Sequence, residues 1–181
     1  MKHQKRIGIL FPVALTCLLV LSAPAIAQEK AKLSDAEVAF TAVTANQIDI
    51  NYAAIAKEKS KDPEVLKFAE TMERDHKAVI EQAVALAKKL GVTPKDNAVS
   101  QKLMADAEKT KSLLRSKSAD TFDKAYIDNE VTYHKAVIEA VEGLLIPDTE
   151  NAELKELLQN VVPALKAHLM HAEMLQKSLT K

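Results

Sequence analysis

Apolar residues recur every three or four positions along nearly the whole chain after residue 34, which is the period of an amphipathic helix. Few residues interrupt that pattern, because the 181-residue chain has only three glycines and six prolines and is rich in Ala, Leu and Lys. A helix with one apolar stripe must bury that stripe against other helices. The sequence therefore predicts an all-α fold of long helices around a shared core.

Start and stop signals divide this pattern into separate helices. Ser34 and Glu37 form a capping box at the start of the first helix. Asp62 and Pro63 open the second helix, and Gly91 ends it. The expected helices span residues 35–59, 63–90, 98–115, 118–145 and 150–179.

The lengths of these helices and of their connections predict the architecture. Tight turns join the first helix to the second and the last two to each other, whereas residues 91–118 are long enough to return along the bundle. This pattern predicts a ferritin-like four-helix bundle, with an extra shorter helix in the long crossover; a plain up-down bundle is the alternative. The sequence His-Lys-Ala-Val-Ile-Glu occurs at residues 76–81 and again at 134–139, which would also fit a duplication.

The first 27 residues have the composition of a signal peptide. Basic residues among the first six precede an apolar stretch over residues 7–21, and Ala25 and Ala27 supply the small residues of a cleavage site. That stretch is shorter than the roughly 20 residues of a spanning helix, so cleavage is favoured over an uncleaved anchor. We expect a signal peptide at 1–27 and one domain at 28–181, periplasmic or secreted. No transmembrane span remains after cleavage, and outer-membrane association is left open.

Composition argues against several functional classes. Lys and Arg (25) balance Asp and Glu (25), and the expected mature domain has no concentrated basic run, so a nucleic-acid partner is not expected. The single cysteine, Cys17, lies within the predicted signal peptide. No glycine-rich phosphate loop and no Gly-x-Ser-x-Gly motif occurs. An enzyme is therefore not favoured, while a protein partner or a homo-oligomer is left open.

Ionisable residues interrupt the apolar stripes near the middle of the four long helices. A simple hydrophobic seam would not contain them, because a buried ionisable group without a partner is destabilising. Imidazoles and carboxylates bind transition metals, so these positions predict a site for iron, zinc or copper at the bundle centre. The predicted ligands are Asp49, His76, Glu130, His134 and His168. A closed His–carboxylate hydrogen-bond network without metal is the alternative.

Other polar and soft side chains lie close to these positions. Glu73 and His171 are weaker candidate ligands; Glu73 precedes His76 by three residues, but a di-iron oxidase would need a second such pair and is not favoured. Asp75 lies one residue off the stripe, which favours a solvated acid over one that orients a histidine. Met170 and Met174 would suit copper, although core filling or a half-exposed surface is the simpler role.

The chain from Ser34 onward resembles domain-of-unknown-function family 4142, a family of exported bacterial proteins. The matching stretches are Ile55-Ala56, Val65-Leu66-Lys67-Phe68-Ala69, Met72, Asp75-His76, Phe122-Asp123, Tyr126, His134, Val162-Pro163, Leu165, His168-Leu169 and Ala172. The resemblance implies a ferritin-like fold and export but no activity. Asp49 stands where the family commonly has Glu. Two functions remain: a metal-binding protein of the periplasm, or a non-catalytic structural or interaction module of the cell envelope.

Overall fold

The computed structural model describes residues 32–180, in which every regular element is helical. The elements are α1 (Asp35–Lys59), α2 (Pro63–Leu90), α3 (Ala98–Ser116), α4 (Ala119–Ala140), the π-helical turn η1 (Val141–Leu145), α5 (Ile146–Asp148) and α6 (Ala152–Ser178). The all-α prediction is confirmed. The predicted signal peptide at residues 1–27 lies outside the described residues. Within the described part, none of the helices has an apolar stretch long enough to span a membrane.

The residues expected to end the helices do so. Ser34 and Glu37 form the capping box, with the backbone N–H and the hydroxyl of Ser34 donating to Glu37 Oε2 at 3.0 and 2.7 Å. The Asp62 carboxylate accepts from two backbone N–H groups in the first turn of α2, at 2.8 and 3.3 Å. Gly91 has φ +64°, a left-handed conformation that costs other residues energy, and it ends α2. Local sequence therefore sets these boundaries.

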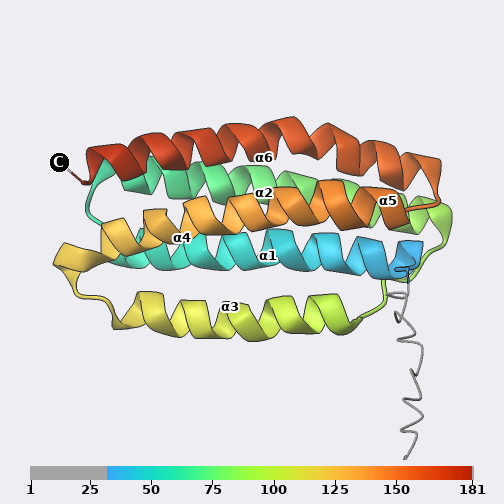
Figure 1. Cartoon of the computed structure of the whole chain (residues 1–181), viewed down its shortest axis with the longest axis horizontal. Helices are drawn as coiled ribbons and strands as arrows, with labels where there is room; N and C mark the ends of the chain where they lie inside the picture. Colours follow the sequence, from blue (N-terminus) through green and yellow to red (C-terminus); the bar gives the residue numbers. More distant parts are fainter. Residues whose placement is uncertain (1–31, 181) are drawn as a thin grey trace, which may run out of the picture. The chain divides into compact units, whose positions relative to one another are not determined.

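Four long helices form the bundle, and α3 lies outside it. α1 and α2 form one antiparallel hairpin and α4 and α6 form the other, while α3 carries the chain back along α1 between them (Figure 1). Because α3 returns the chain to the end of the bundle where α2 begins, α4 runs in the same direction as α2. The predicted four-helix bundle with an extra helix in the crossover is confirmed.

The helix expected over residues 118–145 is not uniform. Its α-helical hydrogen bonds change to a π-helical turn over Val141–Leu145 and return in α5. Pro147 is the physical reason, because it has no N–H and its ring crowds the carbonyl of the residue four positions earlier. In α6, Pro163 lies inside the helix, and the helix arches because proline removes a backbone hydrogen bond (Figure 1).

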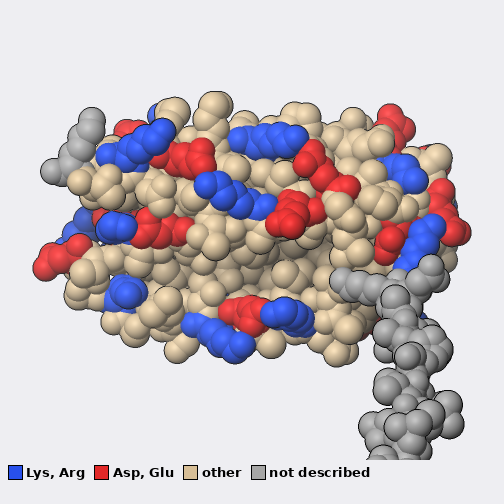
Figure 2. Space-filling model, in the orientation of Figure 1, with Lys and Arg blue, Asp and Glu red and all other residues tan. Residues whose placement is uncertain are grey.

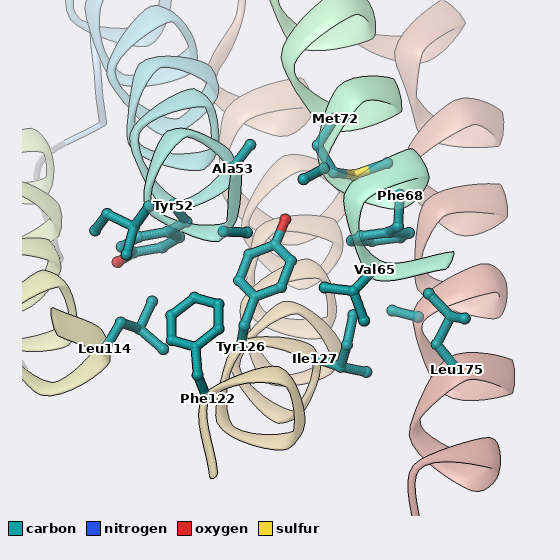
Figure 3. Close-up of a cluster of buried hydrophobic side chains, with 14 of the residues drawn as sticks. Tyr52, Ala53, Val65, Phe68, Met72, Leu114, Phe122, Tyr126, Ile127 and Leu175 are labelled. Carbon is teal, nitrogen blue, oxygen red and sulfur yellow. The ribbon is translucent and has the colours of Figure 1, made fainter. Parts of the chain in front are cut away.

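One apolar cluster lies at each end of the bundle. The cluster near the α1–α2 turn contains large, fully buried side chains, including Phe68, Met72, Phe122, Tyr126 and Ile127 (Figure 3). The cluster at the other end is built from aliphatic residues of α1, η1 and α6. The ionisable residues of the predicted site lie between the two clusters along each long helix. Their neighbours on both sides are therefore apolar.

α3 is held against α1 at both of its ends. The Asn97 side chain at its N-terminus donates to Glu37 O at 3.1 Å and to Thr41 Oγ1 at 2.9 Å, both in α1. At its C-terminal end, Lys59 Nζ donates to Arg115 O at 2.8 Å. α3 makes few contacts with α4. One side of α1 and α4 is consequently left open between the bundle and α3.

Candidate metal centre

The four long helices bring five ionisable side chains together at the bundle centre. Asp49 comes from α1, His76 from α2, Glu130 and His134 from α4, and His168 from α6. Their exposed fractions are 0% for Asp49 and Glu130, 1% for His134, 4% for His76 and 7% for His168. Water therefore cannot provide ordinary solvation, and the protein or a bound ion must satisfy these groups.

The five side chains form two overlapping groups of candidate ligands, which share His134. The imidazole rings of His76, His134 and His168 lie 5.4–5.8 Å apart between centroids. Asp49 Oδ2 lies 3.3 Å from His76 Nε2 and 3.6 Å from His134 Nε2. One nitrogen from each of the three histidines lies within 4.8 Å of the other two, and Asp49, Glu130 and His134 form a second group of that kind.

Hydrogen bonds at the outer edge of the cluster fix which nitrogen of two histidines carries the proton. His134 Nδ1 lies 3.0 Å from the Glu130 carbonyl oxygen, and His168 Nε2 lies 3.0 Å from Asp75 Oδ2. A carbonyl or carboxylate oxygen only accepts, so these two nitrogens are the N–H donors. His134 Nε2 and His168 Nδ1 are then unprotonated in the neutral rings.

A side-chain amide fixes the third histidine in the same way. Asn46 Nδ2 donates to the Ala42 carbonyl oxygen at 2.8 Å, which leaves Asn46 Oδ1 to face His76 Nδ1 at 2.7 Å. Because that oxygen accepts, His76 Nδ1 carries a proton, and Nε2 is the unprotonated nitrogen of the neutral ring. In their neutral forms all three histidines therefore direct a lone pair toward the centre.

The centre of the cluster is rich in acceptor atoms that have no hydrogen-bond partner. His76 Nε2, His134 Nε2 and His168 Nδ1 are buried without a hydrogen-bond partner, as are both carboxyl oxygens of Asp49 and of Glu130. Converging lone pairs are unfavourable in a low-dielectric interior unless a cation or a proton lies between them. An outer hydrogen bond on each imidazole is the usual arrangement around a metal ligand, because it orients the ring and fixes the tautomer.

The charges of the cluster favour a cation. Burial opposes ionisation of Asp49, but the three surrounding imidazoles outweigh it and hold the pKa of Asp49 below its ordinary value. Burial raises the pKa of Glu130 well above the usual range, and the nearby Asp49 charge raises it further. Burial also lowers the pKa of His134 and of His168. Asp49 is therefore the carboxyl group of the cluster that ionises readily, whereas Glu130 favours its neutral acid form.

Two supporting residues change the interpretation of the sequence. The prediction that Asp75 is a solvated acid is wrong, because it accepts from His168 as well as from Arg74. Burial opposes its ionisation, but hydrogen bonds from Arg74 and His168 lower the pKa of Asp75. Sequence analysis missed Asn46, although this amide lies close to one helical turn before Asp49 on the same face. The sequence signal for Asn46 is a polar side chain close to an acid on a predicted buried stripe.

The weaker candidate ligands lie outside the cluster. Glu73 forms ion pairs with two lysines on the outer face of α2, at 2.5 and 2.6 Å. The His171 ring meets the edge of Phe68, with 5.2 Å between ring centroids. Met170 and Met174 are exposed on α6, at 61% and 59%. These positions do not bring Glu73, His171 or the methionines to the five central residues.

A cavity adjoins the cluster. Its volume is about 450 Å³, and Asp49, His76, His134 and His168 form part of its wall. The rest of the wall comes from five helices, including α3, and is mostly apolar. The centre is therefore buried by side chains but lies beside an internal space rather than in a fully packed core.

The fold and the cluster define an all-helical bundle protein with a candidate metal centre of three imidazoles and a carboxylate. The chain belongs to the family described as "Domain of unknown function (DUF4142)", whose profile matches residues 20–175. Membership confirms the resemblance seen in the sequence. No protein of curated function matches the sequence.

A solved structure has the same fold. It is titled "CopM in the Cu(II)-bound form" and superposes with a TM-score of 0.62. The match covers 82% of this chain and 99% of that chain, with 17% sequence identity. At this identity the likeness establishes a shared helical-bundle fold.

Proposed function

We propose that the protein is an exported, non-catalytic helical-bundle protein that binds one divalent transition-metal ion at the bundle centre. The proposed ligands are His76 Nε2, His134 Nε2, His168 Nδ1 and a carboxylate oxygen of Asp49. The convergence of three unprotonated imidazole nitrogens, each fixed by an outer hydrogen bond, is the observation that carries the proposal. Glu130 is the candidate fifth ligand, once a metal replaces its proton.

The donor set narrows the choice of metal. Imidazole nitrogen and carboxylate oxygen suit Cu(II), Zn(II) and Fe(II), whereas Cu(I) prefers the thiolates and thioethers that this donor set lacks. The Cu(II)-bound form of a protein with the same fold adds support for copper. Binding, storage or transfer of the ion fits this centre better than catalysis, because its ligands already fill a tetrahedral site.

Export is supported by the N-terminal sequence. Its basic start, short apolar stretch and Ala-x-Ala ending are the features of a signal peptide. Within the described residues, apolar clusters rather than disulfides hold the helices together. The ferritin-like arrangement of two hairpins around a central ligand set also fits a metal-handling role.

Metal titration of the purified chain tests the proposal. We expect one Cu(II) or Zn(II) per chain, nitrogen hyperfine structure from several imidazoles in the electron paramagnetic resonance spectrum of the Cu(II) form, and a rise in Tm. Free metal at 100 times Kd adds about 2.7 kcal/mol of stability. That corresponds to a Tm increase of about 5–10 °C for a domain of this size.

Two histidine variants provide the matched comparison. The triple change His76→Ala, His134→Ala and His168→Ala should abolish stoichiometric binding. His171→Ala, also on α6 but outside the cluster, should leave it unchanged. Equal metal content in the triple variant and in the wild type would contradict the proposal. In that case a loss of thermal stability in the triple variant would instead favour the metal-free network, in which a protonated His76 pairs with Asp49 at 3.3 Å.

A further inference from the structure

The cavity beside the metal centre has walls that are ordered by polarity. Along α4 and η1, the wall residues pass from Tyr133 and His134 on α4 to Val141 and Leu145 on η1. α6 runs in the opposite direction and shows the opposite order, from Leu154 through aliphatic residues to His168. Because α4 and α6 are antiparallel (Figure 1), their polar wall residues lie together at the bundle centre. Their apolar wall residues lie together toward the α4–α6 turn.

The other three helices repeat the same order. On α2 the wall begins with Asp75 and His76 and ends with Ala83, and on α1 it passes from Ala39 to Asp49. α3 contributes aliphatic side chains at its N-terminal end, with Asp106 and Thr110 farther along. Apart from Thr41 on α1, the walls therefore have their polar residues beside the metal centre and their apolar residues at the far end. We call this space the axial chamber.

Side-chain size explains why the axial chamber exists at this end of the bundle. The opposite end is filled by fully buried aromatic and long aliphatic side chains (Figure 3). The corresponding positions around the chamber include Ala39, Ala83 and Ala140, so the helices leave a space that larger residues would fill. Protein interiors otherwise pack to crystal-like density, and unfilled apolar volume is destabilising in proportion to its size. The chamber volume is about three times that of an engineered cavity of about 150 Å³ that binds benzene.

The axial chamber opens along the gap between α3 and α4. α3 is tied to α1 and contacts α4 little, and side chains of both α3 and α4 line the space. Figure 2 shows a hollow on this face, with mostly uncharged atoms, above the charged side chains of α3. A ligand could therefore enter sideways without separating the four helices of the bundle.

The dimensions of the apolar half select an extended molecule. From the helical rise per residue, the apolar half is about 14 Å long between Ala136 on α4 and Leu145 on η1. Along α6 it is about 16 Å long, between Leu154 and Leu165. An extended hydrocarbon chain advances about 1.3 Å per carbon, from a C–C bond of about 1.5 Å. About ten to twelve carbons therefore match the apolar half.

We infer that the axial chamber binds a linear fatty carboxylate with a tail of about ten to twelve carbons, whose carboxylate faces the metal centre. Binding of the tail depends on the chamber alone, whereas binding of the carboxylate rests on the proposed metal site. In the four-ligand site, without Glu130 as a fifth ligand, a divalent ion and Asp49 leave one positive charge, which a ligand carboxylate neutralises in place of Glu130. Without metal, the acceptors of the centre repel a carboxylate but accept a hydroxyl donor.

A chain-length series measures the fit. Saturated carboxylates from hexanoate to hexadecanoate are titrated into the Zn(II)-loaded chain, below their micellar concentrations, by calorimetry. We expect Kd to fall about fourfold for each added methylene up to about dodecanoate, because each buried CH₂ contributes a nearly constant free energy. Kd should then stop falling, since longer tails outgrow the chamber. A Kd that keeps falling through hexadecanoate would indicate adsorption to the surface and overturn the inference.

Filling variants locate the tail. Ala83→Phe, at the apolar end, should weaken dodecanoate binding at least 30-fold and leave hexanoate binding unchanged. Ala85→Phe is the matched control, because Ala85 is exposed on the same helix and does not line the chamber. Ala140→Leu, on α4, is a second filling change in case the first alters the fold. Unchanged dodecanoate binding in correctly folded Ala83→Phe and Ala140→Leu proteins would refute the chamber as the site.

Titration with decanol, which has no carboxylate, tests the chamber inference independently of the metal proposal. If the chain takes up no Zn(II) but binds alcohols with the expected length dependence, the metal proposal fails and the chamber stands. If Zn(II) binds and neither carboxylates nor alcohols show length dependence, the chamber inference fails and the metal centre stands. Decanoate should bind the Zn(II)-loaded chain at least tenfold more tightly than the metal-free chain, whereas decanol should not show this preference.

Discussion

Asp75→Asn is the most direct test of how the structure prepares His168 for metal. Asp75 is partly exposed and touches the centre only through the His168 Nε2–H bond of 3.0 Å. The substitution keeps the shape of the side chain but removes its charge. It also leaves an amide that holds the His168 tautomer less strongly. We expect weaker metal binding with the same stoichiometry of one ion per chain.

The size of the loss follows from two independent arguments. Removing a hydrogen-bonding partner behind a metal ligand commonly lowers affinity 10- to 100-fold, or about 1.4–2.7 kcal/mol. The Asp75 charge lies about 7 Å from the ion, the sum of the 3.0 Å hydrogen bond, the width of the ring and a metal–nitrogen bond of about 2 Å. At that distance a divalent ion and a carboxylate interact by about 1 to 5 kcal/mol, for effective dielectric constants of about 80 to 20. The two ranges overlap.

A competition assay with a chromophoric Zn(II) chelator at constant ionic strength measures the affinity. Glu73→Gln is the control, because it removes the same charge two residues earlier on α2, where the carboxylate pairs with lysines on the outer face. It should change the metal affinity less than threefold. Equal losses in both variants would mean that only net charge matters, and an unchanged Asp75→Asn affinity would refute an orienting role for Asp75.

Three further predictions concern the metal-free protein and are measured by chemical denaturation in chelator. Burial raises the pKa of Glu130, so the folded chain holds a proton that the unfolded chain releases, and stability falls as pH rises above the ordinary glutamate value. Glu130→Gln removes this loss and should therefore stabilise the protein more at pH 8 than at pH 5; an equal gain at both would contradict the raised pKa. Tyr126→Phe should stabilise by roughly 1 kcal/mol, because its buried hydroxyl has no partner, and a loss above 1 kcal/mol would show that the hydroxyl is satisfied. Gly91→Ala should cost about 1 kcal/mol at φ +64°, whereas the helical Gly143→Ala should gain about 0.5–1 kcal/mol, and effects of the same sign would refute the conformational argument.

The tyrosines show where reasoning from the sequence ends. A buried tyrosine usually directs its hydroxyl toward a polar partner, and Tyr133 does so by donating to the Ala45 carbonyl oxygen at 2.8 Å. The Tyr126 hydroxyl has no such partner, although its ring packs against Phe68 and Phe122. The helical period identifies the face on which a ring lies, but a hydroxyl partner comes from another helix and leaves no trace in that period.

The helices and the residues that they bury could be predicted from local sequence. Caps such as Ser34–Glu37 and Asp62 act over three or four residues, and the 3.6-residue period places Asp49 and His168 on buried stripes. Both are local properties of the chain, so they could be predicted without knowing the neighbouring helices.

How these residues interact across the bundle depends on the tertiary structure. The proton positions on His76 and His168 depend on Asn46 and Asp75, which approach from other helices. The axial chamber likewise depends on alanines of different helices facing one another, whereas along each helix an alanine simply continues the apolar stripe. Hydrogen bonds and cavities between helices arise from distances across space, which a pattern along one helix does not encode.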